Sequence, residues 1–173
     1  IPMLPVLRRD SRTVSGRRGP RKPIVCEMLD GLAGAATRGG CEYFVYINSD
    51  IEITPRAIAV IEAKRLEGLG FTRTDRDTAT NAPLGTMRFG VDAFAFAVEW
   101  WYAHRHRFRP YIVGEPVWDN VYLSILLTHS DGQLIDDVGL LLHEQHPSPW
   151  TASPFNDYTW FLAALDRPYF AQW

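Results

Sequence analysis

Helix-type and strand-type patterns alternate along this chain, and the alternation constrains its fold more than any other feature. Apolar residues recur at helical spacing over residues 23–38, and two glycines follow them. Residues 43–47 are continuously apolar and rich in β-formers, which predicts a buried strand. Thr54 and Pro55 are typical of a helix start, so a second helix is predicted over residues 55–67.

The second half of the chain continues the alternation. The predicted strands and helices lie at residues 71–73, 93–97, 100–101, from 119 onward, at 138–142 and at 158–165. Residues 74–90 are polar and contain Pro and Gly, which predicts a loop lying over a site. We therefore predict an α/β fold with a central, mostly parallel sheet flanked by helices. In such sheets, ligands bind beyond the carboxyl ends of the strands.

Length and aromatic content indicate one folded domain. The 173 residues include 6 Trp, 7 Tyr and 9 Phe, which supply more apolar area than a disordered chain carries. No apolar run approaches the ~20 residues of a membrane helix, and residues 1–7 lack the order of a secretory signal. A cytoplasmic protein is expected. Cys26 and Cys41 form no Cys-x-x-Cys pair, so a structural zinc site built on cysteine is not expected.

Charge divides the chain into two parts. Residues 1–22 hold seven Lys or Arg against one Asp, a net charge of +6, whereas the remainder holds eleven basic and nineteen acidic residues, a net charge of −8. We predict a basic N-terminal arm over residues 1–22 and a single α/β domain over residues 23–173. Such an arm suits a phosphate-bearing ligand or a nucleic acid, and a solvated, mobile terminus is the simpler interpretation.

Polar residues that follow predicted strands are candidates for a metal site. Asp50 comes after the strand at 43–47, with Asn48 two residues before it, and a carboxylate there is a suitable ligand for a hard divalent cation. His143 and His146 follow the last predicted strand and are spaced to reach one metal ion. The alternatives are an ordinary turn at residues 48–50 and surface histidines beside a proline-rich loop.

Asn48 is also a candidate for a substrate contact, and further candidates lie between Asp50 and His143. Asp92 enters an apolar segment and needs partners, which are either substrate hydroxyls or peptide N–H groups. Trp118 offers a flat ring for stacking on a sugar, and Asn120 completes a Trp-Asp-Asn sequence. Asp119 is either a catalytic base that also binds hydroxyls or the N-terminal cap of a helix.

Taken in order, these segments resemble the glycosyltransferase-like proteins of bacteria and plants that have the GT-A fold, the metal-dependent nucleotide-sugar fold. The resemblance covers roughly residues 1–150 and rests on residues 22–30, 43–51, 90–96, 114–120 and 143–146. It implies a GT-A-like α/β fold that lacks a complete N-terminal nucleotide-binding unit. Asn48 stands where this family has the first carboxylate of an Asp-x-Asp motif.

The resemblance also implies roles for individual residues. Asp50 would bind a divalent metal, Mn²⁺ or Mg²⁺, through the diphosphate of the donor, and His143 would be a further ligand. Asp119 would activate the acceptor, with Trp118 stacking on a sugar. The implied partners are a nucleotide-sugar donor and a glycan or small-molecule acceptor. A sheet lacking part of its strands would expose an edge that a second copy of the chain can cover.

Three other functions remain open at this point. One is a non-catalytic sugar- or protein-binding module derived from the same fold. Another is a small metal-dependent hydrolase that uses His143, His146 and a carboxylate such as Asp119. Nucleic-acid binding through the basic arm is a weaker interpretation, and a steep loss of affinity with salt would identify it.

Overall fold

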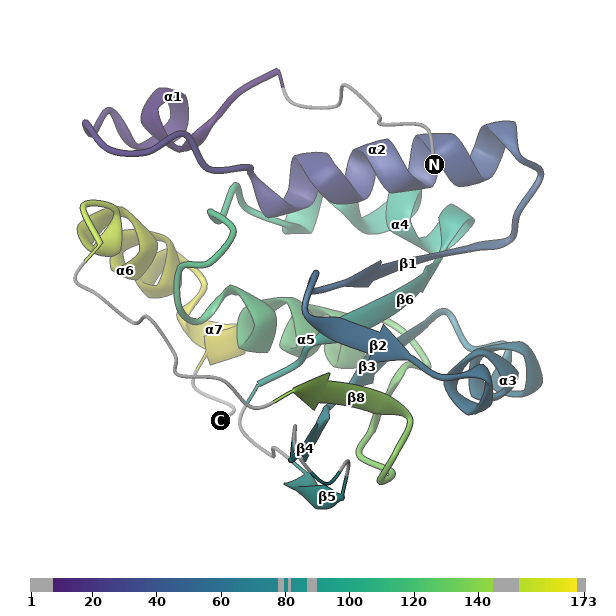
Figure 1. Ribbon diagram of the computed structural model, residues 1–173. Helices are drawn as coiled ribbons and strands as arrows, with labels where there is room; N and C mark the ends of the chain where they lie inside the picture. Colours follow the sequence, from purple (N-terminus) through teal and green to yellow (C-terminus); the bar gives the residue numbers. More distant parts are fainter. Residues whose placement is uncertain (1–7, 78–79, 81, 87–89, 145–152, 171–173) are drawn as a thin grey trace.

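Two four-stranded sheets form the centre of the molecule in the computed structural model, which describes residues 8–77, 80, 82–86, 90–144 and 153–170 (Figure 1). The first sheet contains, in spatial order, β1 (Tyr43–Ile47), β6 (Ala93–Ala97), β3 (Gly68–Phe71) and β7 (Gln133–Ile135). The second contains β2 (Ile51–Ile53), β8 (Leu141–Glu144), β4 (Thr74–Arg76) and β5 (Pro83–Thr86). The chain passes from the first sheet to the second three times, from β1 to β2, from β3 to β4 and from β7 to β8.

The prediction of a central, mostly parallel sheet is wrong. Among the described strands, β6 runs antiparallel to both of its neighbours, β1 and β3, and β2–β8 and β4–β5 are also antiparallel pairs. Only β3–β7 and β4–β8 are parallel within this part of the chain. Residue patterns identify a strand but leave its direction undetermined, and an alternation of helices and strands is compatible with antiparallel as well as parallel pairing. The fold is mixed α/β with two small, mostly antiparallel sheets, which differs from the central, mostly parallel sheet expected of a GT-A-like fold.

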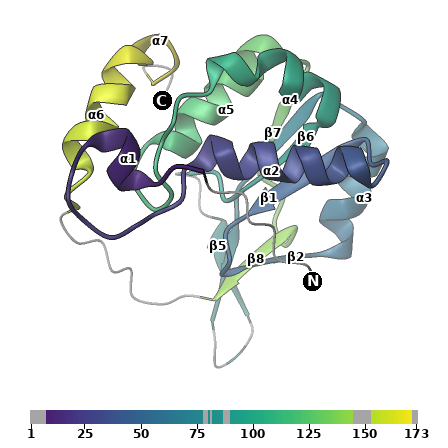
Figure 2. The same ribbon diagram turned by 90° about the horizontal axis from the view of Figure 1, so that it is seen from above.

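Helices α2, α4 and α5 lie on one face of the first sheet and α3 lies on the other. The helices of the described residues are α1 (Ser11–Ser15), α2 (Val25–Arg38), α3 (Pro55–Lys64), α4 (Val98–His104), α5 (Trp118–His129), α6 (Asn156–Leu165) and α7 (Arg167–Phe170), with a 3-10 turn η1 (Arg105–Arg107). Helix α2 crosses over β1 (Figure 2), and it shares one apolar core with α4 and α5. Helix α3 belongs to a second core, on the opposite face, together with residues of β2 and β8.

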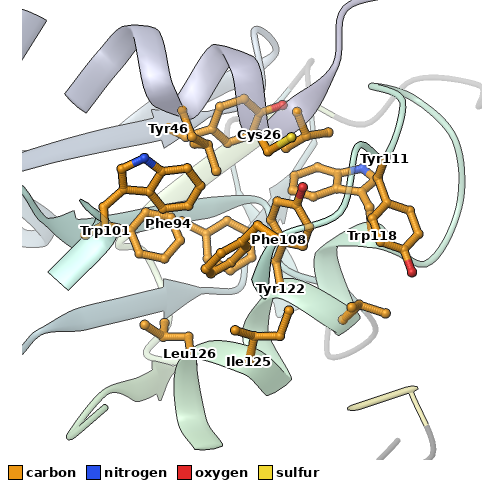
Figure 3. Packing of buried hydrophobic residues seen from close by; sticks show 14 of the residues in the cluster. Cys26, Tyr46, Phe94, Trp101, Phe108, Tyr111, Trp118, Tyr122, Ile125 and Leu126 are labelled. Carbon is orange, nitrogen blue, oxygen red and sulfur yellow. The ribbon is translucent and has the colours of Figure 1, made fainter. Parts of the chain in front are cut away.

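Alternation along β6 separates the two cores. Phe94 and Phe96 face the core under α2, α4 and α5, whereas Ala93 and Ala95 face the core that contains α3. This confirms the predicted strand, because side chains alternate between the faces of a sheet. Figure 3 shows the aromatic residues that gather around Phe94. Aromatic side chains of this size contribute most of the area that a core buries.

Two glycines in β3 set how closely α5 approaches the first sheet. A Cβ at Gly70 would lie 2.6 Å from Leu123 Cδ1, and a Cβ at Gly68 would overlap Leu126. Both leucines lie on α5 and are buried. Larger residues in β3 would therefore move α5 away from the sheet, and α5 carries Trp118 and Asp119 in its first turn.

The described part of the basic arm is tied to the domain. Ser11 is buried, and its hydroxyl donates to the carbonyl of Pro20 at 2.8 Å while accepting from Lys22 N–H at 3.0 Å. Lys22 Nζ lies 2.7 Å from Glu115 Oε1, a carboxylate buried in the segment that leads into α5. Residues 8–22 therefore pack on the body of the protein next to the start of α5.

The remaining element predictions meet the structure unevenly. The helix at 23–38 and the strand at 43–47 are confirmed by α2 and β1. The helix predicted over 55–67 ends at Lys64, because Arg65 takes a left-handed conformation. The loop predicted over 74–90 is wrong where the structure describes it, since β4 and β5 pair there. None of the helices in the described ranges is long and apolar enough to cross a bilayer.

Candidate functional site

Asp50 and His143 are brought together where β1 passes into β2. Asp50 lies in the turn between these strands, and the antiparallel pairing of β2 with β8 sets Ile51 opposite His143. His143 Nε2 is 3.5 Å from Asp50 Oδ2. The expected reason for this proximity was wrong, because His143 lies inside β8 rather than beyond the end of a parallel strand. The antiparallel register of β2 and β8 is what places the two side chains side by side.

Asp75 and Arg73 join this pair, and the sequence predicted neither. Asp75 lies in β4 opposite His143 of β8, in the parallel register of these two strands. Its Oδ1 is 2.8 Å from His143 Nδ1 and 2.9 Å from Arg73 Nε. The imidazole is almost completely buried, between the carboxylates of Asp75 and Asp50. Both residues fall in or beside the polar stretch that was expected to be a loop, and no sequence pattern marked them.

Arg73 also connects the histidine to Asp92. Arg73 Nη1 donates to Asp92 Oδ1 at 3.0 Å, and Asn48 Nδ2 donates to the same oxygen at 3.2 Å. Tyr46 donates its hydroxyl proton to Asn48 Oδ1 at 3.3 Å. Burial raises the pKa of the Asp92 carboxyl, although Arg73 and Asn48 act in the opposite direction. Asn48 and Asp92 therefore belong to one hydrogen-bonded network with the residues around His143.

Asp119 lies in the first turn of α5, beside the segment that leads to Asp92. Its Oδ2 accepts a hydrogen bond from the main-chain N–H of Val91 at 3.2 Å. The N–H groups of Asp119 itself and of Asn120 lower its pKa, but burial has the larger effect and raises it. The carboxylate thus lies in the first turn of α5 and holds residues 90–91 against the helix.

The remaining predicted contacts lie on the same helix. The ring of Trp118 is only 6% exposed and packs edge-on against Tyr46 and Tyr122, with centroid separations of 5.6 Å in each case. A ring buried to this extent has little surface for stacking on a sugar. Asn120 follows in α5 and is partly exposed. His146 lies outside the described residues.

The electrostatics of the site are dominated by carboxylates. Burial, together with the charges of Asp119, Asp50 and Asp92, raises the pKa of the Tyr46 hydroxyl to about 12. Asp75 is a fourth carboxylate in this region. Among the described contacts, the guanidinium of Arg73 pairs with two of the four, those of Asp75 and Asp92. Several carboxylates close together create a negative potential that attracts cations.

Asp50 and His143 are the residues best placed to hold such a cation. Asp50 supplies a carboxylate oxygen whose side chain is 48% exposed, and His143 directs an imidazole nitrogen at it. No group of three or more His, Cys, Asp or Glu with metal-ligand geometry occurs within the described ranges. Two protein ligands suit a Mn²⁺ or Mg²⁺ ion that completes its coordination with water and phosphate oxygens, and the imidazole favours Mn²⁺.

Family models, curated protein sequences and solved structures each give no match to this chain. What the site can do chemically therefore follows from its own residues. It places a carboxylate and an imidazole that could ligate a divalent ion beside a hydrogen-bonded network of partly buried carboxylates. This arrangement can hold a metal-bound anion beside a group that accepts a proton.

Proposed function

We propose that this chain transfers a sugar from a nucleotide diphosphate donor to a hydroxyl acceptor with the help of a divalent metal ion. One observation carries the proposal: four of the five stretches behind the family resemblance meet at one place although they are far apart in sequence. Asn48 hydrogen-bonds to Asp92, Asp50 lies beside His143, and Asp119 holds the main chain at Val91.

The metal position fits the chemistry of the donor. Asp50 and His143 would hold the ion and leave coordination positions for diphosphate oxygens. When bound, a divalent ion neutralises the charge that develops on the departing diphosphate. The carboxylates around Tyr46 support a cation in this region, because among the described contacts they outnumber the one guanidinium, on Arg73, that pairs with them.

Asp119 is the candidate for accepting the proton of the attacking hydroxyl. Its raised pKa makes its carboxylate a stronger base than an exposed one. Asn48 and Asp92 would bind substrate hydroxyls, as part of the network that Arg73 holds in place. Stacking on Trp118 is left out of the proposal because its ring is buried in the core.

The rival functions receive less support. A zinc hydrolase uses three protein ligands around its metal, and the described residues contain no such set. A sugar-binding module would use the ring of Trp118, which is buried instead. A cytoplasmic location and pairing with a second copy remain predictions from the sequence.

Calorimetric titration of uridine and guanosine diphosphates, with and without Mn²⁺, tests the proposal. We expect binding that requires the metal and that disappears in Asp50→Ala. Glu52→Ala is the matched control, because Glu52 is also acidic, lies two residues further along, and pairs with Arg76 away from the histidine. Retention of metal-dependent binding in Asp50→Ala, or its equal loss in Glu52→Ala, would contradict the assignment.

A further inference from the structure

We infer that Asp75 is a positioning residue, which fixes the ring of His143 so that Nδ1 carries a proton and Nε2 faces Asp50. The orientation of the ring follows from the contacts of these residues. Its use in holding a metal ion rests on the function proposed above.

The hydrogen bond itself determines which nitrogen carries the proton. Asp75 and His143 lie opposite each other in neighbouring strands, with Nδ1 and Oδ1 2.8 Å apart. An ionised carboxylate only accepts hydrogen bonds, so Nδ1 has to be the donor. The other ring nitrogen, Nε2, is the one 3.5 Å from Asp50. With the ring held in this way, Nε2 is the nitrogen on the side of Asp50.

Arg73 holds the Asp75 carboxylate in place. Its Nε lies 2.9 Å from the same Oδ1 atom that accepts from His143. The second arm of the guanidinium bonds to Asp92 at 3.0 Å, so its orientation is fixed at both ends. A simple ion pair between Arg73 and Asp75 would leave the short contact to His143 unexplained.

This arrangement is suited to a metal-binding histidine. A carboxylate on the far nitrogen fixes the orientation of an imidazole ligand and increases its basicity, and losing such a partner typically costs about 10- to 100-fold in metal affinity. Asp75 would therefore affect metal binding without contacting the metal. Its effect on the orientation of the ring would depend on the acceptor oxygen, which an asparagine at this position would also supply.

The first test measures the ring nitrogens of His143 by NMR in metal-free protein labelled with ¹⁵N-histidine, at mildly alkaline pH. We expect a proton on Nδ1 in the wild type and in Asp75→Asn, whose amide oxygen still accepts a hydrogen bond. In Asp75→Ala we expect a shift toward the tautomer with the proton on Nε2. A proton on Nε2 in the wild type, or ring signals that are the same in Asp75→Ala, would overturn the inference.

The second test measures binding of Mn²⁺ with uridine diphosphate to the same variants. Asp75→Ala should weaken binding by about 10- to 100-fold, whereas Asp75→Asn should stay close to the wild type. Glu52→Gln removes an acidic partner of Arg76 in the same sheet and serves as the control for general loss of charge. Equal losses in the two Asp75 variants would overturn the positioning role. If the wild type fails to bind, the proposed function falls, while the NMR result still decides the ring orientation.

Discussion

Replacing Arg73 with Met should destabilise the protein, since it leaves two carboxylates without their cation. The side chains of Arg73, Asp75 and Asp92 are 21%, 18% and 9% exposed, and the two ion pairs measure 2.9 and 3.0 Å. Removing one partner of a fully buried pair costs about 3–5 kcal/mol. Solvent reaches this group in part, so we expect a loss of about 2–3 kcal/mol at neutral pH.

Arg76→Met is the matched control for this substitution. Arg76 lies three residues further along, is 20% exposed and also contacts two carboxylates, Glu52 and Glu144. Those two side chains are 56% and 64% exposed, so they return to water when the arginine is lost. We expect a cost of about 1 kcal/mol or less, measured by urea unfolding. Equal losses in the two variants would refute the reasoning.

The deficit of the Arg73 variant should also depend on pH. Burial already raises the pKa of Asp92 in the folded protein, and removing Arg73 raises it further. A carboxyl group with a raised folded pKa binds more protons in the folded state, so the stability it contributes is lost as pH rises through that pKa. The deficit relative to the wild type should therefore be largest near neutral pH and become smaller in acid. A deficit that stays constant with pH would contradict this account.

Three further predictions concern packing, a buried carboxylate and catalysis. A Cβ at Gly132 would lie 2.8 Å from the carbonyl oxygen of Gly68. Gly132→Ala should therefore lower the midpoint of urea unfolding and reduce the free energy of unfolding by about 1–3 kcal/mol. An unchanged midpoint would refute the close approach. Asp166 is buried and accepts a hydrogen bond from the Tyr111 hydroxyl at 3.0 Å. In thermal unfolding, Asp166→Ala should therefore show a free energy of unfolding lower by about 1–3 kcal/mol. Stability equal to the wild type would argue against this hydrogen bond. In the wild type, turnover should rise with pH as Asp119, whose pKa is raised, loses its proton. Asp119→Asn should abolish this rise but still bind the diphosphate. A variant with normal turnover and lower stability would instead give Asp119 a purely structural role at the start of α5.

The predictable parts of the fold are those in which one face of a long element is buried. Helix α2 and strand β1 follow from apolar spacing, because their buried residues recur at the helical and strand periods. Strand β4 was missed because its sequence, Thr-Asp-Arg, is polar: Asp75 points into the site instead of a core. Strand direction was also missed, since it depends on which strands pair and not on any local pattern.

The candidate site shows the same division. The sequence singles out Asp92 because an acidic residue that enters an apolar segment needs partners, and Asn48 and Asp50 because they follow a predicted strand. Arg73 and Asp75 were not found, because their roles depend on contacts between distant parts of the chain. Asp75 meets His143, 68 residues away, across β4 and β8, and Arg73 bonds to Asp92, 19 residues away. Trp118 was expected in the site, but an aromatic residue at the start of α5 serves the core equally well.

Paramagnetic broadening by Mn²⁺ tests the central claim most directly, because it reports where the ion binds. With uridine diphosphate and substoichiometric Mn²⁺, backbone amide signals of residues 48–51 and of His143 should broaden first, and those of α6 last. The broadening should disappear in Asp50→Ala and persist in Glu52→Ala. Broadening centred on another part of the chain, or the same pattern in Asp50→Ala, would contradict a metal site formed by Asp50 and His143.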